Sequence, residues 1–199
     1  MTRAEGQNMK IAVLALQGAF LEHEQMLRRL GADTFEIRKA EDWEKPKDGL
    51  IIPGGESTTQ AKLLRELGLM EPVREAIIGG LPVWGTCAGL ILLADHVVNG
   101  VPSGSLGTMS IDVCRNAYGR QSGSFFTTGT IEGIGDGIPM TFIRAPYISR
   151  VGGNARILSE CGGHIVAAIQ DHQFVTSFHP ELNDDPRVHD YFLRLARRH

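Results

Sequence analysis

Residues 81–93, LPVWGTCAGLILL, read as a short buried strand, a glycine-flanked cysteine and the start of an apolar helix, and the rest of the chain is interpreted around them. At such a turn Cys87 lies at the positive end of the helix dipole, which favours a thiolate. Gly85 and Gly89 relieve crowding there, as in the elbows that expose hydrolase nucleophiles. Cys87 is therefore either a nucleophile or a small buried hydrophobic residue, and the turn alone leaves both open.

Strand and helix patterns alternate before this stretch. Residues 10–16, 50–53 and 82–85 are apolar runs typical of strands buried on both faces, and 34–37 form a shorter strand. Helices are expected over 20–30, from about residue 57 onward, and over 70–78. Ser57 and Gln60 fit the capping-box pattern at the start of the second of these helices. His23 falls on the inward face of the first helix, where we expect a packed, hydrogen-bonded histidine. The alternation predicts a doubly wound parallel sheet that binds ligands at the carboxyl ends of its strands.

From residue 97 onward the pattern changes to strands joined by turns. Strands are predicted over 108–113, 124–131, 140–144, 164–170 and 173–178, and a closing helix over 186–197. The last two strands form a hairpin around Asp171 and His172, and His172 is expected to be a solvated turn residue. The predicted fold class is α/β, a three-layer sandwich with a mostly parallel central sheet and additional antiparallel strands in the C-terminal half.

Length and composition predict one globular domain over residues 1–199, with residues 1–8 as a disordered extension. A net charge of −3 gives no basis for binding nucleic acid or an anionic membrane. No apolar run approaches the roughly 20 residues of a membrane span. Cys87, Cys114 and Cys161 show neither paired nor metal-ligand spacing, so we expect a cytoplasmic protein without a metal.

Three strand ends, at Gln17, Gly55 and Cys87, are predicted to meet at one edge of the sheet. In the segment PGGES, Gly54 and Gly55 can direct backbone N–H groups at an oxygen atom. An ordinary capped turn between strand and helix explains the same glycines. Convergence of the three loops favours the functional interpretation of each.

A base and an orienting acid for Cys87 are available in the segment FHPEL. His179 ends an apolar strand, and Glu181 can accept its ring N–H, although a loop histidine beside a solvated glutamate explains the pattern as well. Arg115 and Arg144 could each pair with a carboxylate. Composition gives no reason to prefer these two arginines over others in the chain.

Six segments together resemble the glutaminase subunits of pyridoxal 5′-phosphate synthases, a family in the triad class of glutamine amidotransferases. They are LALQGAFLEH, IIPGGESTT, PVWGTCAGLILLA, RNAYGRQ, FIRAP and SFHPEL, and the resemblance extends from residue 9 to 197. GxCxG with a later HPE marks the class, whereas PGGEST, RNAYGRQ and FIRAP mark the family. Cys114 departs from it, because an acidic residue is expected before Arg115. The resemblance implies a class I, flavodoxin-like amidotransferase fold.

The resemblance also implies a function: hydrolysis of L-glutamine to L-glutamate and ammonia without a cofactor, with the ammonia passed to a synthase subunit that makes vitamin B6. The implied roles are Cys87 as nucleophile, His179 as base, Glu181 as orienting acid, and the N–H groups of Gly55 and Ala88 as the oxyanion hole. The implied glutamine-binding set is Gly55, Glu56, Ser57, Arg115, Ile143 and Arg144, with Gln17 in a loop near the partner interface and oxyanion site. The alternatives are a glutaminase for another synthase, such as imidazole glycerol phosphate synthase, and a non-catalytic binding module on the same fold.

Overall fold

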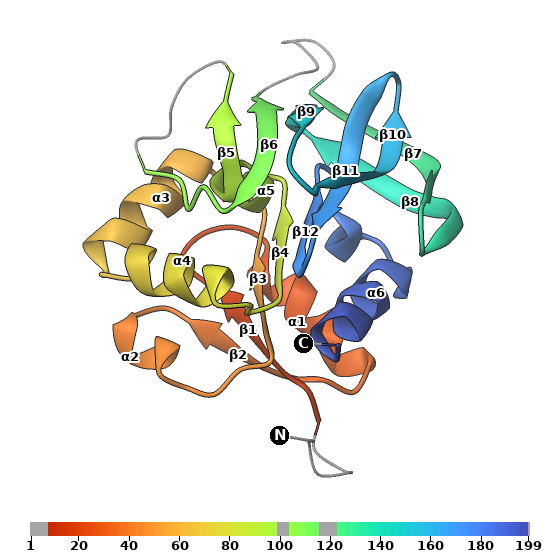
Figure 1. Ribbon diagram of the computed structural model, residues 1–199. Helices are drawn as coiled ribbons and strands as arrows, with labels where there is room; N and C mark the ends of the chain where they lie inside the picture. Colours follow the sequence, from red (N-terminus) through yellow and green to blue (C-terminus); the bar gives the residue numbers. More distant parts are fainter. Residues whose placement is uncertain (1–7, 99–103, 116–122, 199) are drawn as a thin grey trace.

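The computed structural model describes residues 8–98, 104–115 and 123–198, and Figure 1 shows a sheet with helices on both faces. Within these residues the sheet has ten strands in the order β2-β1-β3-β4-β12-β11-β9-β6-β5, and β10 pairs with β11 outside this path. Strands β7 and β8 form a separate two-stranded sheet. The predicted α/β class with added antiparallel strands is confirmed. The extension predicted over residues 1–8 lies outside the described residues apart from Asn8.

The parallel half of the sheet consists of β2, β1, β3, β4 and β12, which run in the same direction side by side. Their bounds are Asp33–Ile37 for β2, Lys10–Leu14 for β1, Gly49–Ile52 for β3, Val83–Thr86 for β4 and Gln173–Thr176 for β12. Every residue of β3, β4 and β12 is buried, as continuous apolar runs predict. The carboxyl ends of β1, β3, β4 and β12 therefore lie along one edge of the sheet.

Helices form the outer layers of the sandwich, and two core clusters fill the space between them and the sheet. On one face lie α3 (Ser57–Glu66), α4 (Met70–Ile78) and α5 (Ala88–Leu93); on the other lie α1 (Phe20–Arg29) and α6 (Arg187–Ala196). A short helix that was not predicted, α2 (Ala40–Trp43), lies next to β2. Among the described residues, no helix combines the length and apolar character that a bilayer span requires.

The strands outside this parallel group are more numerous than predicted. Those near their predicted positions are β6 (Met109–Cys114), β7 (Ser124–Ile131), β8 (Gly135–Ile143) and β11 (His164–Gln170). Three were not predicted: β5 (Ala94–Val97), β9 (Tyr147–Val151) and β10 (Arg156–Cys161). Both β9 and β10 contain exposed polar residues and lack a long buried run, which explains why hydrophobic periodicity did not reveal them.

Two local predictions are wrong. The first residue before α3, Glu56, caps the helix by accepting the N–H groups of Thr58 at 3.0 Å and Thr59 at 2.7 Å, so Ser57 and Gln60 do not form a capping box. His172 is not simply solvated, because its Nε2 lies 2.6 Å from the carbonyl oxygen of Ile77. The hairpin that contains it is confirmed by the antiparallel pairing of β11 with β12.

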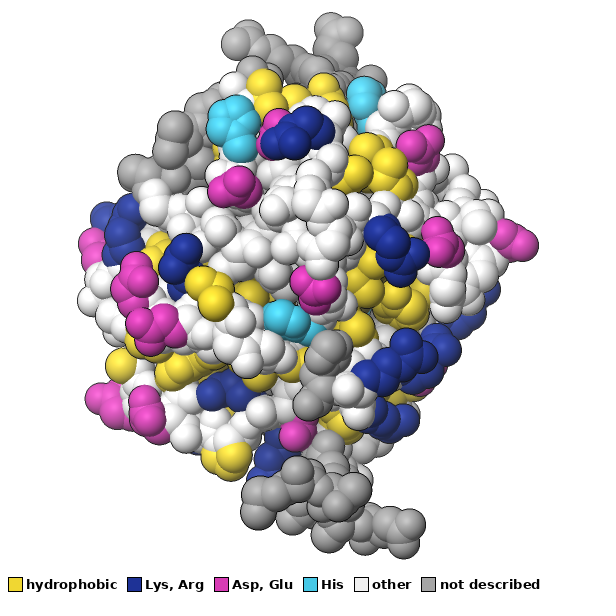
Figure 2. Space-filling model, in the orientation of Figure 1, with side chains coloured by type: hydrophobic (Ala, Val, Ile, Leu, Met, Phe, Trp, Pro, Cys, Tyr) yellow, Lys and Arg dark blue, Asp and Glu magenta, His cyan; other side chains and the backbone are white. Residues whose placement is uncertain are grey.

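Charged side chains of both signs are interspersed over the face in Figure 2, with a group of basic side chains near α6. This mixture fits the small net charge of −3.

Candidate active site

Cys87 occupies the sharp turn between β4 and α5. Its φ of 48° and ψ of −97° lie in a region that L-residues rarely adopt. The backbone N–H of Cys87 donates to the carbonyl of Thr176 at 2.8 Å, which ties the turn to the neighbouring strand β12. The predicted strand–turn–helix elbow is confirmed.

The glycines on either side allow this turn to pack against the sheet. A Cβ atom on Gly85 would lie 2.6 Å from the carbonyl carbon of Gly89, and one on Gly89 would lie 2.1 Å from the carbonyl oxygen of Ile52. Backbone atoms cannot tolerate such approaches without moving. Both positions therefore require glycine, as the elbow pattern predicted.

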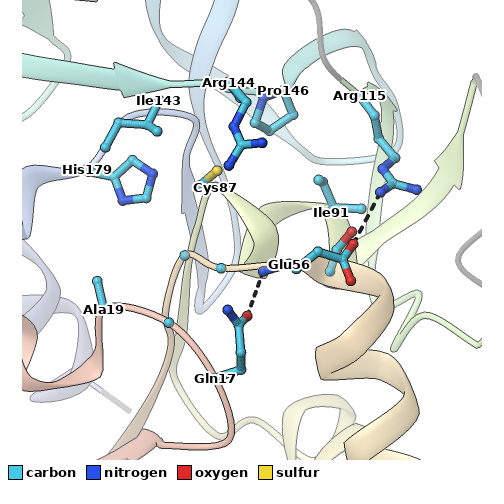
Figure 3. A pocket seen from close by; sticks show the side chains of 14 residues that line it. Gln17, Ala19, Glu56, Cys87, Ile91, Arg115, Ile143, Arg144, Pro146 and His179 are labelled. Carbon is cyan, nitrogen blue, oxygen red and sulfur yellow. Dashed lines mark hydrogen bonds and ion pairs between the residues drawn. The ribbon is translucent and has the colours of Figure 1, made fainter. Parts of the chain in front are cut away.

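His179 and Cys87 approach the same point in space, because each follows the end of one of two paired parallel strands, β12 and β4. A Cβ atom on Gly54 would lie 2.3 Å from His179 Cε1 and 3.4 Å from Cys87 Cβ. Figure 3 shows the imidazole and the sulfur at the same end of the pocket. The structure thus brings together the two residues that sequence spacing could not join.

Glu181 orients the imidazole from behind. Its Oε1 lies 2.7 Å from His179 Nδ1, and because a carboxylate only accepts, Nδ1 is the donor and Nε2 is left for the thiol. Burial lowers the pKa of His179, but hydrogen bonds to Cys87 and Glu181 and the charges of both outweigh it and raise the pKa to about 10. The arrangement favours an imidazolium beside the sulfur.

A pocket of about 350 Å³ lies over Cys87 and His179. It is lined by Gln17, Gly18, Ala19, Gly54, Gly55, Glu56, Ser57, Cys87, Ile91, Arg115, Ile143, Arg144, Pro146 and His179. All the predicted glutamine-binding residues are in this set. Ala88 and Glu181 do not line the pocket and lie buried next to it. Sequence reasoning missed Ala19, Ile91 and Pro146, which carry no polar side chain to signal a role.

Charged side chains at the pocket have complementary signs. Arg115 Nη2 lies 3.5 Å from Glu56 Oε1, and the guanidinium of Arg144 points toward Cys87 in Figure 3. Burial raises the pKa of Glu56, but hydrogen bonds from Thr59 and Thr58 outweigh it and lower the pKa to about 2. The pocket therefore presents one carboxylate and two guanidinium groups, which suits a small zwitterion.

Gln17 joins the loop after β1 to the PGGES loop after β3. Its Oε1 accepts the backbone N–H of Glu56 at 2.6 Å, and its carbonyl accepts Gln60 Nε2 at 2.9 Å. The carbonyl of Gly54 accepts the N–H of Ala19 at 3.2 Å. Because N–H and C=O point in opposite directions across a trans peptide, the N–H of Gly55 faces away from Ala19.

Ser57 contributes a free hydrogen-bonding group. Its side chain is buried, and its Oγ has no hydrogen-bond partner within the described part of the chain. Since buried hydroxyl groups are normally satisfied, an unpartnered one that lines a pocket is available to a ligand.

The environment of His23 matches its prediction, because the side chain is wholly buried and hydrogen-bonded. The RNAYGRQ segment lies outside the described residues except for Arg115. In the described ranges, no cluster of three or more His, Cys, Asp or Glu side chains is placed to hold a metal ion.

Comparison with known proteins places this geometry in context. Residues 13–198 match the model of the SNO glutamine amidotransferase family. The chain is 58% identical over 187 residues to the pyridoxal 5′-phosphate synthase subunit PdxT of Methanocorpusculum labreanum, covering 94% of this chain and 97% of the relative. It is 53% identical over 192 residues to PdxT of Streptococcus pneumoniae, covering 95% and 98%.

Solved structures show the same fold. A crystal structure described as a glutamine amidotransferase superposes with a TM-score of 0.88 at 46% identity, covering 94% of this chain and 98% of that one. A putative GMP synthase component from Thermoplasma acidophilum has a TM-score of 0.68 at 19% identity, covering 98% and 96%, and shares the fold.

Proposed function

The chain belongs to the SNO glutamine amidotransferase family, and from this we propose that it hydrolyses L-glutamine to L-glutamate and ammonia as the glutaminase subunit of a pyridoxal 5′-phosphate synthase. The observation that carries the proposal is the Cys87 elbow with His179 beside it, itself 2.7 Å from Glu181. The name shared by the relatives supports the synthase. The match over residues 13–198 supports one amidotransferase domain.

In the proposed reaction, His179 takes the thiol proton of Cys87, and the sulfur attacks the side-chain amide carbon of glutamine. The carbonyl electron pair moves onto the oxygen, and the imidazolium then gives its proton to the amide nitrogen. The C–N bond breaks, ammonia leaves and a thioester remains. Water, losing a proton to His179, then attacks the thioester carbon. The C–S bond breaks, glutamate leaves, and the imidazolium returns its proton to the sulfur of Cys87.

The oxyanion of the tetrahedral intermediate is proposed to bind the backbone N–H groups of Gly55 and Ala88. Ala88 is the first residue of α5, so its N–H has no partner within the helix. The Gly55 N–H faces away from Ala19 because the preceding carbonyl bonds to Ala19. Each such donor is typically worth about 3 kcal/mol in the transition state.

The glutamine backbone is proposed to bind at the charged end of the pocket. Arg144 suits the α-carboxylate as a planar bidentate donor, and Glu56, whose charge persists down to a pKa of about 2, suits the α-ammonium. Arg115, paired with Glu56, adds a second positive charge for the carboxylate. Ser57 supplies a buried hydroxyl, and Ile143 an apolar wall.

The proposed partner is a synthase subunit that receives the ammonia in a hetero-oligomer, with Gln17 near the interface. Coupling hydrolysis to the partner would prevent loss of ammonia to solvent. The three cysteines, Cys87, Cys114 and Cys161, are free, which suits the reducing cytoplasm.

Reconstitution tests the proposal. Glutamate release and pyridoxal 5′-phosphate formation are measured for three samples. These are the chain alone, the chain with the synthase subunit of a pyridoxal 5′-phosphate synthase, and the chain with the synthase subunit of imidazole glycerol phosphate synthase. We expect activation only by the first synthase. Strong turnover by the isolated chain contradicts the partner requirement, and activation by the other synthase favours the alternative glutaminase.

The role of Cys87 is tested in the same complex. Cys87→Ala should abolish synthesis from glutamine and leave synthesis from added ammonium salt unchanged, whereas Cys161→Ala, at a free cysteine in β10, should retain both. Glutamine hydrolysis by Cys87→Ala would show that another residue is the nucleophile. Absence of labelling of Cys87 by a glutamine-mimicking electrophile in the active complex would favour a non-catalytic module.

A further inference from the structure

Only one oxygen of the Glu181 carboxylate is accounted for by the triad. Oε1 accepts the N–H of His179, whereas Oε2 is buried and has no well-aligned hydrogen-bond donor within the described residues. Oε2 faces His23 Nε2 at 3.5 Å, and both side chains are fully buried. A buried carboxylate oxygen without a donor is costly, so this contact decides how firmly Glu181 is held.

The His23 ring is fixed by three elements of the fold. It projects from α1, and its Nδ1 lies 3.0 Å from Nε2 of His189 on α6. Its Nε2 also lies 3.3 Å from Thr86 Oγ1 at the end of β4. Trp84 packs edge-on against both imidazoles, with ring centroids 5.1 Å from His23 and 4.8 Å from His189. The ring therefore has little freedom to turn away from Glu181.

The hydrogen-bond network selects one tautomer of His23. If the proton is on Nε2, its neighbouring acceptors are Thr86 Oγ1 at 3.3 Å and Glu181 Oε2 at 3.5 Å, and Nδ1 accepts the Nε2–H of His189. Only an acceptor, His189 Nδ1, is then left without a partner among the described atoms. If the proton is on Nδ1, the Nε2 lone pair of His23 faces a carboxylate, and His189 carries a buried Nδ1–H with no acceptor. The first arrangement avoids both penalties.

We propose that His23 is a positioning residue of the triad, which donates its Nε2–H to Glu181 and thereby holds the carboxylate that orients His179, while His189 fixes the tautomer of His23. The proposal rests on the glutaminase function proposed above. It adds a chain of donors that runs from α6 through α1 to the three-residue helix η1 (Pro180–Leu182), which carries Glu181.

Both histidines are suited to this role because they remain neutral. Burial, followed by the charges of His189 and His179, lowers the pKa of His23 well below its usual value. Burial lowers the pKa of His189 to about 3. Each ring therefore carries a single proton near neutral pH, which a directed chain of donors requires.

Two amide substitutions separate positioning from packing. In His23→Gln the amide nitrogen takes the place of Nε2 and can still reach Glu181; in His23→Asn the amide corresponds to Nδ1 and cannot. We expect His23→Asn to lower kcat about tenfold or more with KM unchanged, and His23→Gln to retain kcat within about threefold. Assays use the complex with the synthase, and thermal unfolding confirms that both variants fold.

A second measurement does not depend on glutamine turnover. Alkylation of Cys87 by iodoacetamide at pH 7 requires only the Cys87–His179–Glu181 arrangement, and we expect His23→Asn to react more slowly than His23→Gln and the wild type. Equal alkylation rates and equal kcat in the two variants would overturn the positioning role. If the wild type lacks glutaminase activity, the proposed function fails, and the alkylation rates still decide the role of His23.

A further pair keeps the test decisive if His23 variants do not fold. His189→Gln retains a donor to His23 Nδ1, and His189→Leu removes it. Slower alkylation of Cys87 in His189→Leu than in His189→Gln, with a loss smaller than that expected for His23→Asn, supports the proposal. Indistinguishable alkylation rates in the two His189 variants contradict it.

Discussion

Two residues with left-handed backbone angles meet at the proposed site. Among the described residues, Cys87, Arg144 and Asp171 are the non-glycine residues with positive φ, and the first two line the same pocket. Asp171 sits in a hairpin turn, where such an angle is ordinary. Hydrogen bonds hold the other two, from Cys87 N–H to Thr176 and from Arg144 N–H to Gly123. Strain maintained at a proposed nucleophile and a facing guanidinium is characteristic of a functional site.

Arg144 gives a prediction about substrate binding. Arg144→Lys keeps the positive charge and loses the planar fork, so we expect KM for glutamine to rise about tenfold with a smaller change in kcat. Steady-state glutaminase kinetics of the reconstituted complex measure this. Arg156→Lys, at an exposed pair with Glu132, serves as the control and should behave as the wild type. An unchanged KM in Arg144→Lys would remove Arg144 from the binding set.

Gln17 gives a prediction about the oxyanion loop. Gln17→Leu removes the acceptor for the Glu56 N–H and loosens the loop that carries Gly55, so kcat should fall by about tenfold to a hundredfold. Gln17→Glu retains an acceptor at the same position and should lose less. The comparison is made by kcat of the two variants in the complex. If Gln17→Leu matches the wild type, the side chain does not order the loop.

At the scale of elements, the elbow depends on close backbone packing between α5 and β3. Gly89→Ala would place a Cβ 2.1 Å from the carbonyl oxygen of Ile52, and we expect a loss of about 3 kcal/mol or more in the free energy of unfolding. Urea denaturation measures it. Gly68→Asn is the matched control, because Gly68 has a φ of 68° and open space around it; its effect should stay below about 1 kcal/mol. A similar loss in both variants would refute the packing argument.

The elements that sequence predicts well are strands buried on both faces and a helix with a regular buried face. The apolar runs of β3 and β4 and the helix α4 (Met70–Ile78) were predicted within a residue or two, because hydrophobic burial alone specifies them. By contrast, β9 pairs with β6, which is distant in the chain, and β10 pairs with the next strand, β11; both β9 and β10 are partly exposed. Such pairing leaves little periodic signal in a single sequence.

The candidate site divides in the same way. The elbow at Cys87 and the candidate pair His179 and Glu181 follow from local patterns, and the family resemblance added their roles and the glutamine-binding set. Residues 23 and 189 are 166 positions apart, so no local pattern could reveal their hydrogen bond. The cap at Glu56 was missed because Ser57 and Gln60 fit a more familiar pattern, while the actual cap lies one residue earlier.

At the scale of the whole molecule, two buried histidines, His179 and His189, give the free energy of unfolding opposite dependences on pH. The pKa of His179 is raised to about 10, so its contribution is complete below an unfolded-state pKa near 6.5 and is lost as pH rises toward 10. The pKa of His189 is lowered to about 3, so its contribution is complete above 6.5 and is lost as pH falls toward 3. Together they favour greatest stability near pH 6.5.

His189→Gln tests the acid side of this balance. Between pH 6.5 and about 3 the unfolded chain binds a proton at His189 that the native protein does not, so stability falls with pH by up to about 1.4 kcal/mol per unit from this group. Glutamine keeps the donor to His23 and removes the titration. Urea unfolding at pH 7, 6, 5 and 4 should therefore give a shallower fall for the variant, with parallel curves above pH 7. Equal slopes would mean that His189 accepts a proton in the native state. Its Nε2–H would still donate to His23, but the added Nδ1–H would be buried without an acceptor among the described atoms, so the buried layer would have to rearrange.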